Sequence, residues 1–146
     1  MSEIAPFIAV LESAQKKESN ITPDVQQAAE GIDIEALKAA YEKVAEQGEF
    51  ESVEGADKDV LNKAFEFAAK AVMLLKTSPG LLEKKDLYIY FKVSKGEAME
   101  KPGMFDIQKK QLFGAWEKVK DYNPSKANQL YIAHVNTLIS KYGTRE

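Results

Sequence analysis

Tyr88 and Lys92 lie four residues apart in the segment DLYIYFKVSK. In a helix this spacing places both side chains on one face. A tyrosine ring can stack on a purine and a lysine ammonium can pair with phosphate oxygens, so the two residues together suit a nucleotide or one of its derivatives. Spacing alone equally permits a simpler interpretation, in which Tyr88 is a half-buried aromatic residue and Lys92 is a solvated surface charge.

Residue types that bind metals or act as nucleophiles are scarce. The chain has no cysteine, and His134 is its single histidine. Disulfides and thiolate metal sites are excluded, and almost no material remains for a zinc site, a Cys-His pair or a Ser-His-Asp triad. We therefore expect no catalytic residue, no metal and no cofactor, and we interpret His134 as a packing or surface residue.

Charge divides the chain into two unlike parts, although the whole carries a net charge of only -3. Residues 1–57 contain 4 Lys and 13 Asp or Glu, a net charge of -9, whereas residues 58–146 contain 16 Lys or Arg and 10 Asp or Glu, a net charge of +6. A basic domain favours an anionic partner. The lysine clusters at 83–86 and 109–111 are too short and too mixed in sign to indicate nucleic acid.

The elements that would position these residues are predicted to be helices. Apolar residues recur at helical spacing, and no alternating strand pattern is present, so the fold class is all-α. In the C-terminal part the breaker Thr77-Ser78-Pro79-Gly80, an Asp106 N-cap and the pair Asn123-Pro124 separate four helices. The expected helices cover roughly residues 60–75, 82–93, 106–120 and 124–142, the last closed by Gly143, and they form a compact bundle.

Residues 1–57 are predicted to form an acidic N-terminal extension, helical or partly disordered. Apolar residues at 7–11 and 34–44 indicate one or two short helices, and the acidic, glycine-containing residues 48–57 indicate a linker to the domain at 58–146. The extension either packs on the bundle or acts as a tether. The first residues do not resemble a secretory signal and no run is long enough to span a bilayer, so we expect a cytoplasmic protein without an integral membrane segment.

Several segments of the C-terminal part together resemble the acyl-CoA-binding protein family. In order, they are FEFAAKAVMLLK, DLYIYFKVSKGE, EKPGMFD, GAWEKVK and ANQLYIAHVNTLISKYG. The block from Leu87 to Lys92, with Pro102-Gly103 ahead of Trp116, is specific in combination. This resemblance implies a four-helix bundle that binds medium- to long-chain fatty acyl-CoA esters without catalysis, as an intracellular carrier and pool former.

The resemblance also implies which residues contact the ligand. Tyr88 would contact the adenine region, Lys92 the phosphates, and Tyr131 the 3′-phosphate or ribose. Small alanines beside Phe65 would allow close approach of the pantetheine and acyl chain. Plain helix packing is the competing explanation for the apolar members of the set, which comprises Phe65, Ala68, Ala69, Tyr88, Ile89, Tyr90, Phe91, Lys92 and Tyr131.

The chain departs from the family pattern at two positions where a lysine is usual, because it has Met73 on the first helix of the domain and Leu112 on the third. A charge-assisted hydrogen bond to phosphate is worth about 1.5–3 kcal/mol, so each uncompensated loss is expected to weaken binding by roughly one to two orders of magnitude. Lys70 and Lys109 each lie one turn before these positions. Either long side chain can compensate, and we include both as candidate phosphate contacts.

The leading hypothesis is therefore a non-enzymatic, monomeric carrier or buffer of fatty acyl-CoA. The alternative is a helical protein-interaction module that kept the bundle, lost affinity for acyl-CoA and engages a partner protein through residues 1–57. An enzyme acting on the thioester is poorly supported, because no nucleophile and base can be named.

Overall fold

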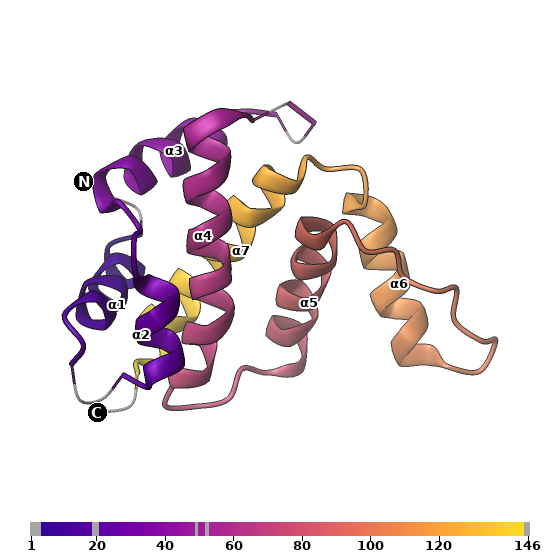
Figure 1. The fold of residues 1–146 in the computed structure, drawn as a ribbon. Coiled ribbons are helices and arrows are strands. Elements are labelled where there is room, and N and C mark those ends of the chain that lie inside the picture. Colours follow the sequence, from indigo (N-terminus) through magenta and orange to yellow (C-terminus); the bar gives the residue numbers. More distant parts are fainter. Residues whose placement is uncertain (1–3, 19–20, 49, 52, 145–146) are drawn as a thin grey trace.

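The computed structural model describes residues 4–18, 21–48, 50–51 and 53–144, which fold into helices (Figure 1). Apart from a single bridge between Leu75 and Thr144, these described residues contain no β-structure. The predicted all-α class is confirmed. The helices are α1 (Ala5–Gln15), α2 (Pro23–Ala29), α3 (Ile34–Glu46), α4 (Gly55–Ala71), the 3-10 turn η1 (Val72–Leu74), α5 (Leu81–Lys95), α6 (Ile107–Val119) and α7 (Pro124–Tyr142).

Helix α7 is the central element of the C-terminal part, because it packs against both α4 and α5. Its apolar stripe is fully removed from solvent at Ile132 and Val135, and α4 contributes the buried Leu61 and Phe65. Burying a side chain of this size stabilises the fold by about 1.5–3 kcal/mol. These contacts make one continuous core out of segments far apart in the sequence.

Two of the helix starts follow the capping chemistry expected from the sequence. The Asp106 carboxylate accepts a hydrogen bond from the Lys109 amide at 3.1 Å at the start of α6. The Asn123 side chain accepts from the Ser125 amide at 2.9 Å ahead of α7, whose first residue is Pro124. Gly143 ends α7 with a backbone φ of 71°, which suits a residue without a Cβ.

The N-terminal part forms three helices, whereas its sequence pattern predicted one or two. The additional one is α2, whose start is fixed by Pro23 at its first position and by Asp24 in its first turn. With only seven residues, α2 has too few turns for a readable apolar periodicity, and only its buried Val25 and Ala29 mark the inner side.

The three N-terminal helices pack on the bundle: α2 and α3 contact α4, and α1 and α3 contact α7 (Figure 1). The ring of Phe7 meets that of Phe67 edge-on, with 5.7 Å between centroids. The Phe7 amide also donates to the Asn136 side-chain oxygen at 2.9 Å. The sequence left open whether the extension packs on the bundle or acts as a tether. In the structure it packs on the bundle.

A buried lysine fastens the end of α3 to α7. Lys126 is only 8% exposed, and its ammonium donates to the carbonyls of Val44, Ala45 and Gln47 at 3.0–3.3 Å. These carbonyls belong to the C-terminal end of α3, where backbone acceptors lack intrahelical partners and the helix dipole is negative. The cation therefore adds a donor to the carbonyls at this helix end, of which that of Val44 also accepts from the Gln47 amide at 3.1 Å.

Two elements of the C-terminal part differ from expectation. Helix α4 begins at Gly55, inside the segment expected to be a linker, and ends at Ala71 before the η1 turn. Helix α6 has no buried residue, and among the helix pairs in substantial contact it pairs only with α5. Its aromatic residues Phe113 and Trp116 are half-buried, so α6 flanks the bundle rather than completing a compact one (Figure 1).

Within the described residues, no helix combines the length and apolar character needed to cross a bilayer.

Candidate functional site

A groove runs between α5 and α6 and holds two adjoining cavities. The first, of about 370 Å³, is mainly apolar and lies between the first turns of α5 and the first half of α6. Leu81 and Leu82 are 81% and 72% exposed beside it, an unusual position for large aliphatic side chains. The residues lining it are Leu81, Leu82, Lys84, Lys85, Tyr88, Gln108, Gln111 and Leu112.

The second cavity, of about 690 Å³, is more polar and lies between α5, α6 and the loop that joins them. It shares Tyr88 and Leu112 with the first cavity, so these two residues mark the boundary between the apolar and polar parts of the groove. Three lysines, two acidic residues and further loop residues also line it: Lys92, Lys101, Lys109, Glu100, Asp106 and residues 98–99 and 102–103.

The predicted pair Tyr88 and Lys92 faces this groove from α5. The Tyr88 ring is 43% exposed, and the Lys92 ammonium lies 5.5 Å from its centroid. Lys92 is 23% exposed and forms a 3.8 Å ion pair with Glu97. Such a pair is weak in a partly solvated site, so an incoming phosphate can displace it at small cost.

Lys109 and Leu112 face the same groove from α6. Leu112 is half-buried, whereas Lys109 is exposed and pairs with Asp106 over 3.7 Å. Because Lys92 and Lys109 line one cavity from opposite sides, a polyanion bound between them would meet a cation on each side. The structure thus brings four of the predicted residues together.

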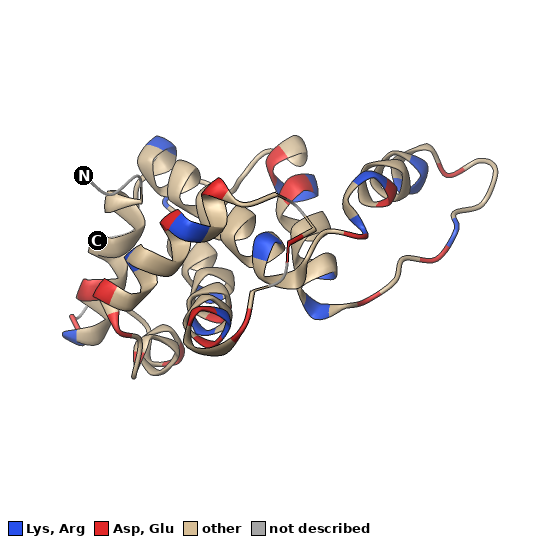
Figure 2. Cartoon of the chain, turned by 90° about the horizontal axis from the view of Figure 1, so that it is seen from above, with Lys and Arg blue, Asp and Glu red and all other residues tan. Residues whose placement is uncertain are grey.

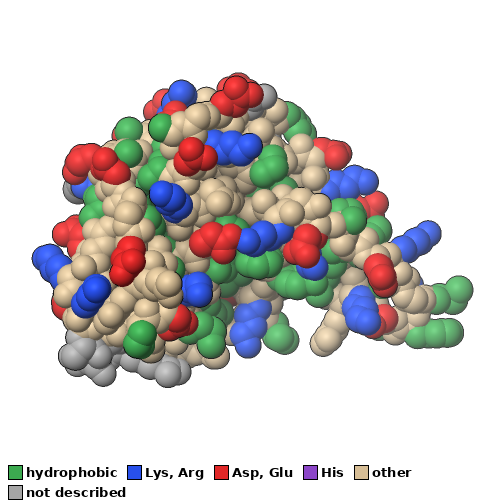
Figure 3. Space-filling view, viewed as in Figure 1, with side chains coloured by type: hydrophobic (Ala, Val, Ile, Leu, Met, Phe, Trp, Pro, Cys, Tyr) green, Lys and Arg blue, Asp and Glu red, His purple; other side chains and the backbone are tan. Residues whose placement is uncertain are grey.

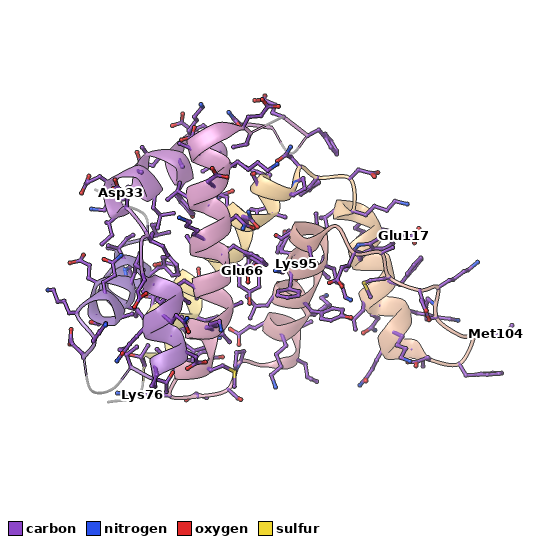
Figure 4. All side chains as sticks on the ribbon, in the orientation of Figure 1. Asp33, Glu66, Lys76, Lys95, Met104 and Glu117 are labelled. Carbon is purple, nitrogen blue, oxygen red and sulfur yellow. The ribbon has the colours of Figure 1, made fainter. Side chains whose placement is uncertain are left out.

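A second group of predicted residues forms an aromatic cluster on the adjacent face of α5. The Phe65 ring lies 5.0 Å from Tyr131 and 5.5 Å from Phe91, centroid to centroid. The Lys95 ammonium lies 5.5 Å from the Phe65 ring and pairs with Glu66 of α4; Figure 4 shows these two charged side chains side by side. The cluster joins α4, α5 and α7 and contributes no residue to the two cavities of the groove.

Burial controls the chemistry of Tyr131. The residue is 5% exposed, and this burial, with a smaller contribution from the Glu66 charge, raises the pKa of its hydroxyl to about 12. The group therefore stays protonated at neutral pH and remains a hydrogen-bond donor.

Other predicted residues lie apart from the groove. Ile89 and Ala68 are buried, and Ala69 is half-buried on α4. Tyr90 stacks on His134 of α7 with 5.3 Å between ring centroids, so this histidine packs against an aromatic residue as expected. Met73 is 74% exposed and lines a separate cavity of about 360 Å³ beside the η1 turn.

Lys70 points away from the groove. It is exposed on the side of α4 that packs against α2. There the Thr22 hydroxyl, donating at 2.6 Å, holds the pKa of Asp24 below its ordinary value, and the Lys70 charge contributes a smaller lowering. Compensation by Lys70 would need a different arrangement, whereas Lys109 already lines the polar cavity.

Several residues that line the two cavities were not predicted from the sequence. Lys101 comes from the α5–α6 loop, and a loop position carries no periodic signal. The adjacent pair Leu81-Leu82 was the available clue, because two leucines in succession cannot both face the core of a helix that begins there. Among the described residues, no three His, Cys, Asp or Glu side chains come close enough to hold a metal ion.

The part of the chain that forms this groove is similar to a known protein family. The family model described as "Acyl CoA binding protein" matches residues 62–135, about half of the chain, which include α5, α6 and the loop between them. The chain belongs to the acyl-CoA-binding protein family. The match leaves α1, α2 and α3 outside it.

Individual relatives agree with this assignment. Acyl-CoA-binding protein homolog 1 of Caenorhabditis elegans is 40% identical over 82 residues, covering 55% of this chain and 95% of that protein. Acyl-CoA-binding protein 2 of Saccharomyces pastorianus and the acyl-CoA-binding protein of Saccharomyces cerevisiae are each 37% identical over 87 residues, covering 58% of this chain and 100% of each relative. These relatives are almost completely covered, so the N-terminal helices are additional to the family domain.

Proposed function

We propose that this protein binds fatty acyl-CoA in the groove between α5 and α6 and carries or buffers it in the cytoplasm as a monomer. The observation that carries the proposal is the pairing of two unlike cavities that share Tyr88 and Leu112. An acyl-CoA is an amphiphile with a polyanionic nucleotide at one end and an aliphatic chain at the other. Family membership supports the same ligand.

In this proposal the nucleotide phosphates occupy the polar cavity. Lys92 and Lys109 pair with them from opposite helices, and Lys101 adds a third cation from the loop. The exposed Tyr88 ring stacks on the adenine at the boundary. A net positive lining draws the anion in, although Glu100 and Asp106 reduce its charge.

The acyl chain occupies the apolar cavity, where it covers Leu81, Leu82 and Leu112. Covering exposed aliphatic surface stabilises the complex by roughly 25 cal/mol per Å² removed from water. In this proposal the groove holds the thioester without transforming it. Intact thioester after prolonged incubation, measured by mass spectrometry, is the expected result.

Isothermal titration with palmitoyl-CoA tests the proposal. We expect saturable binding, weakened roughly tenfold or more in Lys92→Ala and in Lys109→Ala, because each loses a charge-assisted contact. Lys118→Ala is the matched control, since it removes an exposed lysine from the last turn of the same helix α6 but outside the lining of both cavities.

Titration with CoA lacking an acyl chain distinguishes the contribution of the polar cavity to binding from that of the apolar cavity. We expect Lys92→Ala to weaken binding of both palmitoyl-CoA and CoA, whereas Leu82→Ala should weaken binding of palmitoyl-CoA only, because Leu82 lines the apolar cavity. Absence of saturable palmitoyl-CoA binding, or equal affinity in Lys92→Ala and Lys118→Ala, would overturn the assignment.

A further inference from the structure

Glu97 follows the C-terminal end of α5 and pairs with the lysine that faces the polar cavity. Its carboxylate lies 3.8 Å from the Lys92 ammonium. Glu97 lines a separate cavity of about 240 Å³ beside Trp116. It therefore holds, from outside the polar cavity, the cation to which the proposed function assigns the ligand phosphates.

The end of α5 brings Glu97 back beside Lys92. Gly96 has a backbone φ of 69°, in the left-handed region that a residue without a Cβ adopts readily. The Glu97 amide donates to the Lys92 carbonyl at 3.0 Å, and the Gly96 amide donates to the Val93 carbonyl at 3.1 Å. These two hydrogen bonds form the Schellman pattern of a helix end. The chain turns back there, so two opposite charges five residues apart in the sequence become neighbours.

Carboxylates balance the lysines of the polar cavity. Three lysines and two acidic residues line it, a net charge of +1, and Glu97 brings the charge of the group to zero. Lys109 is also paired, with Asp106 at 3.7 Å. Figure 2 shows acidic and basic residues interleaved along the loop between α5 and α6, and Figure 3 shows side chains of both signs at the α6 end of the molecule. An arriving phosphate therefore meets two lysines that already have anionic partners.

Glu97 and Asp106 differ in what else they do. The Asp106 carboxylate also caps α6 by accepting from the Lys109 amide at 3.1 Å, so its removal would disturb that helix. The Glu97 side chain is 53% exposed, so its charge can be removed with little effect on packing. Because the lysine stem is flexible, the Lys92 ammonium can turn from Glu97 to a phosphate without movement of α5.

We propose that Glu97 is a resting counter-ion for Lys92, so that phosphate binding exchanges one ion pair for another, and that this exchange lowers the affinity of the polar cavity for its ligand. A carboxylate attached five residues away stays near the ammonium at every ligand concentration, which makes it a persistent competitor. The proposal rests on the proposed function, because the ligand phosphates must reach Lys92. Weaker contacts act mainly by faster dissociation, which suits a carrier that must release its ligand.

Isothermal titration of the full chain with palmitoyl-CoA tests the proposal. Glu97→Gln keeps the size of the side chain and removes its charge. We expect the affinity to rise roughly two- to fivefold, which is the range of an exposed ion pair. In the Lys92→Ala background the same substitution should give a much smaller rise, because no ammonium is left for Glu97 to occupy.

Glu100→Gln is the matched control. Glu100 lines the polar cavity but forms no ion pair with Lys92 in the described part of the chain, so this variant removes a charge without removing a competitor. Its effect on affinity should be the same with and without the Lys92 ammonium. An equal rise from Glu97→Gln in both backgrounds would overturn the proposal, because long-range attraction alone would then explain it.

Inorganic pyrophosphate separates this proposal from the identity of the ligand. The carbon NMR signal of the Glu97 carboxylate should shift as pyrophosphate displaces it from Lys92, and it should shift much less in Lys92→Ala. If palmitoyl-CoA does not bind, the proposed function fails and the pyrophosphate titration alone decides. A shift that depends on Lys92 then supports the exchange, and the absence of such a shift overturns it.

Discussion

Leu112 lies at the boundary of the two cavities, where its side chain touches both the apolar and the polar part of the groove. An aliphatic side chain there extends the apolar cavity but leaves Lys92, Lys101 and Lys109 as the cations of the polar one. At position 112 the site therefore has an apolar contact in place of a positive charge.

Leu112→Lys should increase affinity for CoA without an acyl chain by roughly tenfold or more, because a new ammonium at the boundary gains a charge-assisted contact with phosphate. Isothermal titration measures the change. The gain should be smaller for palmitoyl-CoA, since the substitution also removes apolar surface.

Gln111→Lys is the matched control for this substitution. It adds the same charge one residue earlier, at a position that lines only the apolar cavity. An equal increase in both variants would mean that long-range attraction, rather than a contact at residue 112, sets the affinity.

At this scale the sequence indicates which residues share a helix face, but it does not decide between candidates such as Lys70 and Lys109, whose positions depend on tertiary structure. Tyr88 and Lys92 share a face because they are four apart on one helix. That Lys109 lies across the groove while Lys70 points toward α2 follows from how α4, α5 and α6 pack, which spacing does not encode.

The junction of α3 with α7 depends on one buried cation. Lys126→Met keeps much of the aliphatic stem but leaves three carbonyls at the end of α3 without their donor. We expect a loss of about 1–3 kcal/mol in the free energy of unfolding, measured by urea denaturation. Lys38→Met removes a lysine whose ion pair is exposed and should change stability much less; equal losses would contradict a special role for Lys126.

A second junction joins the start of α5 to the end of α7 through Glu83. Its carboxylate accepts from the Tyr142 hydroxyl at 2.6 Å, from the Gly80 amide at 2.8 Å and from the Lys141 ammonium at 3.2 Å. The Tyr142 hydrogen bond is the main reason that the pKa of Glu83 falls to about 2, with the Gly80 amide next.

Glu83→Gln should therefore change how stability depends on pH. The folded pKa is below the unfolded one, so the contribution of Glu83 is present above about pH 4.5 and is lost as the pH falls toward 2. Melting temperatures measured across this window should fall less steeply in Glu83→Gln than in the unmodified protein. Parallel curves would show that the carboxylate is not coupled to folding.

Whole elements were predictable where capping chemistry marked their ends. Asn123-Pro124 and Gly143 bound α7, and Asp106 starts α6, because each satisfies or tolerates unpaired backbone groups. Helix α2 has only Pro23 and Asp24 as signals and too little length for periodicity, so it was missed. The peripheral position of α6 could not be predicted from its apolar residues, because they do not indicate which other helix α6 packs against.

The molecule as a whole is one core assembled from a family domain and three further helices. A fragment of residues 54–146 would expose the ring of Phe67, which Phe7 covers in the full chain. We expect this fragment to be destabilised by at least the cost of truncating a buried phenylalanine, about 3–5 kcal/mol, and to bind a hydrophobic dye.

Phe67→Lys tests this prediction, because it should impair the full chain and improve the fragment. The substitution should lower the melting temperature of the full chain, where it buries a charge, and raise the solubility of the 54–146 fragment, where it replaces exposed apolar surface. A fragment as stable as the full chain would contradict a stabilising role for the N-terminal helices.

The contacts of Lys126 and Phe7 also determine whether the chain would separate after cleavage between α3 and α4. The chain passes from α3 to α4 between Gln47 and Gly55, while the ammonium of Lys126 and the Phe7–Phe67 ring pair hold the two parts together across that connection. Cleavage there would leave two pieces that migrate as one particle on a native column and separate only in denaturant. The N-terminal helices would thus remain in place as a bound subunit after the peptide bond to the rest of the protein had been cut.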